Sequence, residues 1–313
     1  MLLRIGAFLV LGLALSIVGA AALAGLGLRL EGRSRLLGTA VSLFVCIGVG
    51  VLLLRRLDGR PAGALGFALT RAAWRESALG LAIGTGALGV AVVVLLVTGK
   101  LGYGADAGSL EFWAATIGGD FVVLAIAAAS EEALFRGYPF QVLAERFGAV
   151  TATAVGSVLF ALAHGANPSV GLFAMTNIFL AGVLLSVAYL KTCSLWFATG
   201  VHLGWNWAMA SLFDLPVSGI AFFDTPLYEP VVGSPQWFTG GMFGPEGGMV
   251  GTLGFAAALL AVFRLRSVRV AAETRTRRPL LLSGSGSGSG DESGSGSGDE
   301  SGGGAESGSW GRE

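Results

Sequence analysis

Long apolar stretches alternate with short polar connections along almost the whole chain. Each stretch approaches the ~20 residues that an α-helix needs to cross a bilayer. The stretches are Leu2–Leu28, Leu36–Leu54, Ala78–Thr98, Phe112–Ser130, Phe147–Ala163, Val170–Tyr189, Leu195–Phe213 and Met249–Phe263. Because backbone groups in lipid must find hydrogen bonds within the protein, the pattern predicts an all-α polytopic transmembrane bundle of about eight spans. Glycine-rich stretches such as GLAIGTGALG are expected to let helices approach closely.

Composition supports a multi-pass membrane protein whose first partner is the lipid bilayer. Apolar residues make up 53% of the chain and charged residues 13%, which is roughly half the usual charged share of a soluble domain. The formal net charge is zero, so nothing indicates a nucleic-acid partner. Cys46 and Cys193 lie far apart and resemble neither a disulfide framework nor a metal-binding pair.

The distribution of Lys and Arg predicts the orientation of the spans. Arginines gather after the second stretch and after the last one, whereas residues 214–248 carry four acids and no Lys or Arg. Both termini are therefore expected in the cytoplasm, although Arg29, Arg33 and Arg35 disagree with this assignment. The first stretch also has features of a signal peptide, but its length favours a retained span.

The stretch SEEALFRG at residues 130–137 places charges at the end of an apolar run. Glu132 and Arg136 are four residues apart, so on a helix they lie on one face and can form an ion pair. Glu131 is turned about 100° away from Glu132 and is left to face something else. Charged groups within a membrane indicate function, although the acids alone could equally mark the water interface.

The chain's two histidines both lie in or at the end of apolar stretches. His164 follows Phe160 by four residues, and His202 precedes Asn206 by four, so each pair shares a helix face. Together with the two glutamates these groups are what a hydrolase needs to activate water and stabilise an oxyanion. No serine lies in a GxSxG elbow and no cysteine is near a histidine, which disfavours a nucleophilic side chain.

Three short motifs, EEALFR, FALAH and HLGWN, occur in this order on successive apolar stretches. Their spacing resembles the EExxxR, FxxxH and HxxxN patterns of the CAAX-protease and bacteriocin-processing (CPBP, or Abi) family of intramembrane proteases, which includes the Ras-converting CAAX endopeptidase. The resemblance covers roughly Phe112–Phe213. It implies an intramembrane endopeptidase that acts on a peptide or membrane-associated protein, in the inner membrane of a prokaryote.

The resemblance also implies roles for the motif residues. Glu131 and His164 would hold and deprotonate the attacking water, and His202 and Asn206 would donate to the oxyanion. The supporting ion pair would be Glu132 and Arg136. No cofactor is required in this mechanism; the alternative is an open zinc site with Glu131, His164 and His202 as ligands. We favour metal-independent catalysis because the HExxH spacing of the best-known zinc proteases is missing.

This mechanism imposes a geometric condition. If the fourth span ended at Ser130, Glu131 would lie near one membrane face and His164 near the other. The two can share a water only if that helix continues through Arg136 and the segment before Phe147 is partly embedded. We therefore predict a catalytic cavity within the membrane, open to the cytoplasm.

The expected organisation follows from these features. Its parts are N-terminal helices with a basic cytoplasmic connection (1–110), a CPBP-like catalytic core (111–214), an extracytoplasmic loop (215–248), a last transmembrane helix (249–270) and a cytoplasmic tail (271–313). The tail is basic at first and then, from Ser283, a Ser/Gly-rich acidic segment expected to be disordered. The alternatives are a non-catalytic scaffold or immunity-type protein on the same fold and a proton-coupled transporter, the latter disfavoured by the lack of internal repeats.

Overall fold

The computed structural model describes residues 1–26, 35–221 and 223–282. Its helices are α1 (Leu2–Gly25), α2 (Arg35–Leu57), α3 (Arg71–Val97), α4 (Leu110–Phe135), α5 (Tyr138–Ala163), α6 (Leu172–Thr192), α7 (Leu195–Trp207), α8 (Gln236–Thr239), α9 (Met249–Arg264) and α10 (Ala272–Arg275). The first connection and the tail from Ser283 lie outside the described residues. What the sequence predicts for these two segments stays a prediction. The all-α polytopic bundle that the sequence predicts is confirmed.

Five helical stretches in the described part of the chain are long and apolar enough to cross a membrane. One of them, Leu110–Ala163, contains both α4 and α5, while α9 is apolar but shorter. Helix α7 has only 13 residues, and ten of them are buried. The chain is thus an integral membrane protein, and the count of about eight spans stays a prediction.

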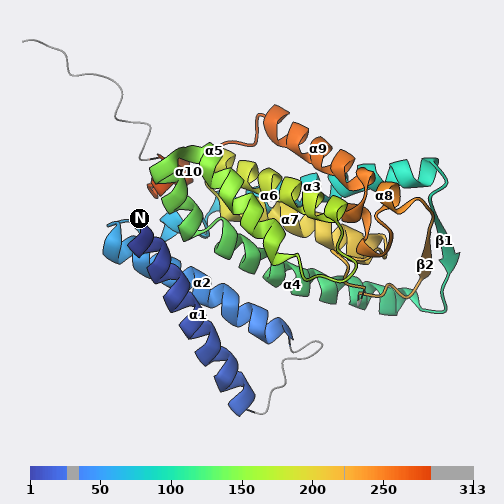
Figure 1. Ribbon diagram of the computed structural model, residues 1–313, viewed down its shortest axis with the longest axis horizontal. Helices are drawn as coiled ribbons and strands as arrows, with labels where there is room; N and C mark the ends of the chain where they lie inside the picture. The colour runs from blue at the N-terminus through green and yellow to red at the C-terminus, as the bar shows by residue number, and fades with distance from the viewer. Residues whose placement is uncertain (27–34, 222, 283–313) are drawn as a thin grey trace, which may run out of the picture.

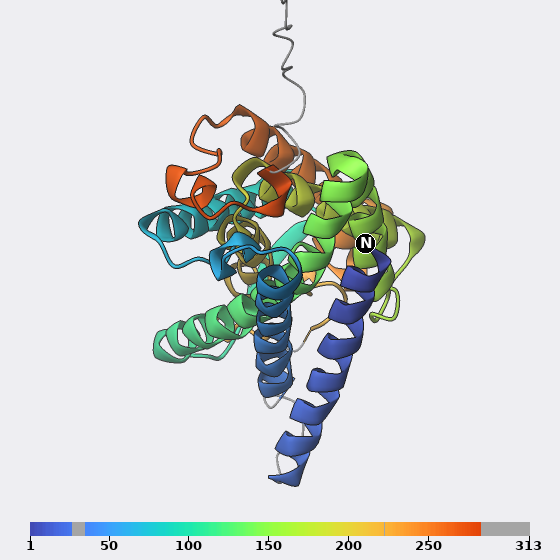
Figure 2. The ribbon, with the colours of Figure 1, turned by 90° about the vertical axis from the view of Figure 1, so that its left-hand side faces the viewer.

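Helix α7 occupies the middle of the bundle, in contact with α3, α4 and α6 (Figure 1). A helix that is apolar all round belongs in such a central position. The other view shows α1 and α2 side by side, extending away from the remaining helices (Figure 2). Arg4 fastens α1 to the bundle through ion pairs with Asp58 and Glu145, and Phe8 stacks on Tyr138.

Glycines set the close approach of α3 to α7. A methyl group on Gly84 would overlap the carbonyl oxygen of Val201, and one on Gly204 would overlap that of Leu81. Gly80 and Gly200 meet the facing backbone in the same way. The expectation from the glycine-rich stretch is therefore confirmed, since only glycine lets these two backbones lie so close together.

Helix α5 changes direction at Gly148, whose φ of 84° and ψ of 164° are not helical. The half that follows packs back on the half that precedes, with the ring of Phe140 lying against Gly156. Tyr138 and Phe140 are buried, and α4 continues to Phe135. Helix α4 therefore passes Ser130 as expected and ends at Phe135, with Arg136 as its C-cap, and the segment before Phe147 packs into the protein. Its embedding in the membrane stays a prediction.

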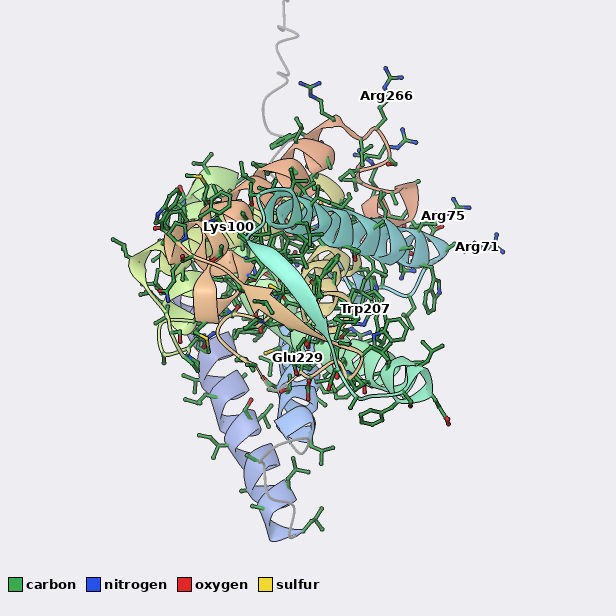
Figure 3. The ribbon with its side chains drawn as sticks, turned by 90° about the vertical axis from the view of Figure 1, so that its right-hand side faces the viewer. Arg71, Arg75, Lys100, Trp207, Glu229 and Arg266 are labelled. Carbon is green, nitrogen blue, oxygen red and sulfur yellow. The ribbon has the colours of Figure 1, made fainter. Side chains whose placement is uncertain are left out.

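The segment predicted as an extracytoplasmic loop, 215–248, is partly folded into the bundle. Strand β2 (Tyr228–Val232) pairs antiparallel with β1 (Leu101–Ala105), which follows α3. This strand pair was not expected from the sequence. Figure 3 shows it on the side facing the viewer with Lys100 and Glu229 nearby, while Arg71, Arg75 and Arg266 point away from the bundle. Leu215, Val217 and Phe243 of the same segment are buried in the core.

Candidate active site

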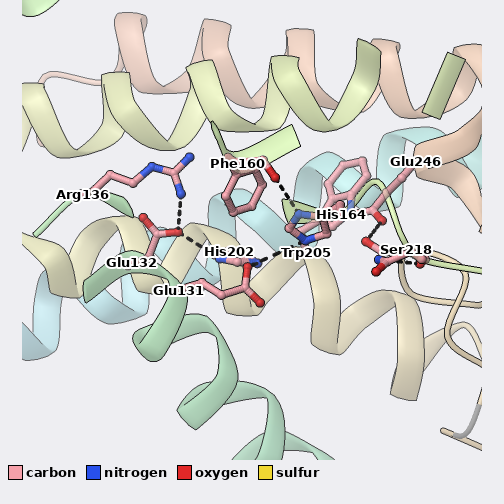
Figure 4. Close-up of polar contacts among 10 residues, drawn as sticks. Glu131, Glu132, Arg136, Phe160, His164, His202, Trp205, Ser218 and Glu246 are labelled. Atoms are coloured by element: carbon pink, nitrogen blue, oxygen red, sulfur yellow. Dashed lines mark hydrogen bonds and ion pairs between the residues drawn. The ribbon is translucent and has the colours of Figure 1, made fainter. Parts of the chain in front are cut away.

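The side chains predicted from the three motifs meet between α4, α5 and α7 (Figure 4). Glu131 and Glu132 lie in the last turns of α4, His164 caps the C-terminal end of α5, and His202 lies midway along α7. The reversal at Gly148 returns the chain to the level of Glu131, which brings His164 beside it. We therefore find these predicted residues together, and Asn206 lies one turn beyond His202.

A buried ion pair stands at one side of this group. Nη1 of Arg136 donates to Oε1 of Glu132 at 3.1 Å, and both side chains are 0% exposed. Nη2 donates to the carbonyl oxygen of Gly182 at 3.0 Å. The guanidinium also lies 4.4 Å from the centre of the Phe160 ring. The ion pair expected from the i, i+4 spacing is thus present, in a site closed to water.

His202 is fixed by the same glutamate, a contact that the sequence did not predict. Its Nδ1 lies 3.0 Å from Oε1 of Glu132. Because an ionised carboxylate can only accept, Nδ1 must carry the proton. In the neutral ring Nε2 is then unprotonated, and it can donate a hydrogen bond only when His202 is an imidazolium.

His164 is held in the same tautomer by a backbone group. Its Nδ1 lies 2.8 Å from the carbonyl oxygen of Phe160. A carbonyl also only accepts, so Nδ1 carries the proton and Nε2 of the neutral ring is an acceptor. The FxxxH motif thus contributes its backbone as well as its ring, which lies 4.7 Å from the imidazole centre.

Both free imidazole nitrogens face Glu131. Oε2 of Glu131 lies 3.9 Å from Nε2 of His164 and 3.8 Å from Nε2 of His202. This oxygen is buried and has no hydrogen-bond partner, although the side chain as a whole is 35% exposed. Contacts of this length are too long for direct hydrogen bonds and suit groups that share one small bridging ligand.

Residues 113–208 match the family model described as type II CAAX prenyl endopeptidase Rce1-like. The match spans the glutamates and both histidines. Over these residues the chain is similar to the CAAX-protease family, which supports the resemblance that the three motifs indicate. No curated protein and no solved structure matches the chain.

The two histidines line a partly open cavity. Its polar end is formed by His164, His202, Asn206, Ser218 and Glu246. The walls are mainly apolar side chains of α6, α7 and α9. Ser218 and Glu246 come from the segment predicted as extracytoplasmic, so the opening toward the cytoplasm stays a prediction.

Glu246 is the main residue of the site that the sequence analysis missed. Its Oε1 accepts from the indole Nε1 of Trp205 at 2.9 Å, and its Oε2 accepts from Oγ of Ser218 at 2.5 Å. The amide of Asn177 donates to its backbone oxygen at 2.8 Å. The only signal was an acid among glycines in FGPEGG, which predicts a turn and not a place beside α7.

The donor set also fits a metal ion chemically. One carboxylate and two imidazoles are ligands that zinc accepts, and both imidazoles keep Nε2 available while Nδ1 is held by a second group. Among the described residues, the three whose ligand atoms all lie within 4.8 Å of one another are the exposed acids Asp106, Asp224 and Glu229; Glu131, His164 and His202 do not form such a group. On ligand chemistry and their distances to Glu131, the residues that would hold zinc in the alternative mechanism are Glu131, His164 and His202.

Proposed function

We propose that the chain is an intramembrane endopeptidase that hydrolyses a peptide bond in a peptide or membrane-associated protein. The observation that carries this proposal is the convergence of two free imidazole nitrogens on one unpartnered carboxylate oxygen of Glu131. A carboxylate and an acceptor nitrogen at this separation can hold a water between them. The match of residues 113–208 to the model of a type II CAAX prenyl endopeptidase family supports the same activity.

In the proposed reaction Glu131 is the general base. It takes a proton from a water that also donates to Nε2 of His164, and the water oxygen forms a bond to the peptide carbonyl carbon. The carbon–nitrogen bond then breaks as Glu131 returns its proton to the leaving nitrogen. The first products are a carboxylic acid and an amine, and transfer of the acid's proton to the amine gives a carboxylate and an ammonium group. Glu131 is then again ionised, as at the start.

The developing oxyanion is stabilised by His202 and Asn206 in this proposal. Because Nδ1 of His202 already donates to Glu132, donation from Nε2 requires the imidazolium form. Glu131 and Glu132 flank this ring and favour a positive charge on it. The ion pair with Arg136 holds Glu132 in place, so Arg136 and Glu132 position His202.

Zinc is the alternative to unassisted catalysis by Glu131. A zinc ion held by Glu131, His164 and His202 would lower the pKa of a bound water and polarise the peptide carbonyl. In that case the hydrogen bonds of Phe160 and Glu132 would orient the two histidine ligands. Chelation separates the two mechanisms.

The test is cleavage of a quenched-peptide library, with a prenylated C-terminal peptide included, by purified protein in detergent. We expect the Glu131→Ala variant to lose cleavage and Glu111→Ala, an exposed acid at the start of the same helix, to retain it. Activity that survives a chelator supports Glu131-activated water, and loss that zinc restores supports the metal site. Equal cleavage by wild type and Glu131→Ala would overturn the proposal in favour of a non-catalytic role.

A further inference from the structure

Glu246 is a buried acid in the cavity whose side-chain partners are all neutral. Its exposure is 4%, and its two carboxylate oxygens accept from the Trp205 indole and the Ser218 hydroxyl. Burial raises the pKa of Glu246, an effect opposed by the hydrogen bond from Ser218 and by the nearby imidazoles. Each carboxylate oxygen has a second lone pair available for a further donor.

Within the residues that the structure describes, no Lys or Arg forms an ion pair with Glu246. Glu132 pairs with Arg136 and Glu131 faces the histidines, whereas these imidazoles act on Glu246 without forming an ion pair with it among the described residues. A buried carboxylate without a countercharge is costly, because it loses hydration that neutral donors replace only in part. A positively charged ligand group in the cavity would remove this cost.

The walls of the cavity indicate what carries that charge. Ile178, Leu184 and Leu185 of α6, Val201 of α7 and Phe255 of α9 line it. These side chains suit a chain of methylene groups, while Glu246, together with Ser218, stands at the polar end. Lysine and arginine have this combination of an apolar stem and a cationic tip.

We propose that Glu246 is a specificity-determining residue that binds the ammonium or guanidinium group of a basic substrate side chain, with the stem of that side chain against the apolar wall. This inference rests on the proposed endopeptidase activity and names the substrate class of the same site. The simpler alternative is that Glu246 only anchors residues 215–248 to α7 through Trp205 and Ser218.

The first experiment compares kcat/KM for peptides that carry Lys or norleucine at each position around the cleaved bond. These residues have the same stem, so the ratio reports the charge alone. At one position we expect wild type to favour Lys by roughly tenfold or more, as a hydrogen-bonded charge contact would give. Glu246→Gln should reduce the ratio to about one, and Glu246→Asp should keep part of it.

The matched control is Glu229→Gln, which removes an exposed acid of the same segment and should leave the ratio as in wild type. A general loss of folding in Glu246→Gln lowers both rates and leaves their ratio unchanged, so it cannot imitate the expected result. A ratio near one in wild type at every position, or an unchanged ratio in Glu246→Gln, would overturn the proposal and leave Glu246 as an anchor.

A binding measurement separates this inference from the catalytic proposal. In the Glu131→Ala background, Lys and norleucine peptides are titrated and the midpoint of thermal denaturation in detergent is followed. A larger shift with the Lys peptide that disappears in Glu131→Ala/Glu246→Gln supports the cation site even if no cleavage is found. Equal shifts with the two peptides count against the site even if the protein proves to be a protease.

Discussion

Nε2 of His164 lies 3.9 Å from Oε2 of Glu131, although the whole of helix α5 separates the two residues in the sequence. The reversal at Gly148 makes this contact possible. Because both groups would act on one water, their contributions to catalysis should depend on each other. This dependence is a sharper test of the site than either residue alone.

Glu131→Ala and His164→Ala should each lower kcat/KM by about 10²–10⁴. The double variant should be no worse than the more damaged single variant, since groups that act as a unit are not additive. Steady-state kinetics with one cleaved peptide give kcat/KM for the two single variants and the double variant. Losses that multiply would show that the two residues act separately.

Arg136→Gln should destabilise the protein by about 3–5 kcal/mol, because it leaves Glu132 as a buried carboxylate without its countercharge. It should also lower activity, since Glu132 fixes the Nδ1 proton of His202. Thermal or denaturant unfolding in detergent measures the loss of stability.

The comparison variant is Glu145→Gln, which breaks the partly exposed pair with Arg4. Pairs of this kind contribute at most about 1 kcal/mol. Similar losses from the two variants would contradict the importance that we assign to burial of the Glu132–Arg136 pair.

Gly84→Ala and Gly204→Ala should each force α3 away from α7 and reduce both stability and activity, because α7 carries His202 and Asn206. Gly86→Ala is the control on the same helix, since nothing lies within 4 Å of the methyl group that it adds. It should be neutral or stabilising by roughly 0.5–1 kcal/mol, the gain in helix propensity. If all three variants behaved alike, the close approach of the helices would not be what positions α7.

Asp214, which follows α7, should make stability depend on pH. Burial raises its pKa from 3.8 to about 6, although its hydrogen bonds with Thr225 act in the opposite direction. The folded state therefore keeps the proton between about pH 4 and 6, where the unfolded state has lost it. The contribution of Asp214 to the free energy of unfolding is therefore fully present below about pH 4 and is lost as the pH rises toward 6.

Asp214→Asn should remove that part of the pH dependence, measured as the midpoint of thermal denaturation between pH 4 and 7. Asparagine suits the position, because residue 214 has a positive φ and its side-chain oxygen can still accept from the Thr225 amide. A variant whose stability falls with pH as steeply as that of wild type would assign the effect to another group.

Much of the site was predictable because it is local. The 3.6-residue period of a helix places Glu132 beside Arg136 and turns Glu131 away, and the structure shows both features. The apolar stretches likewise predict the bundle, and the three motifs lie in the region that matches the CAAX endopeptidase family model. These features depend on spacing along one helix, which the sequence contains directly.

Only the tertiary structure decided which helices meet and which atoms face one another. The contact of Glu132 with His202 joins α4 to α7. Which ring nitrogen of His202 faces Glu132 depends on how α7 packs on the glycines of α3. Glu246 enters the cavity because a segment of 215–248 folds inward, held there by Asn177. Hydropathy carries no information about such contacts, since they arise from packing between segments distant in sequence.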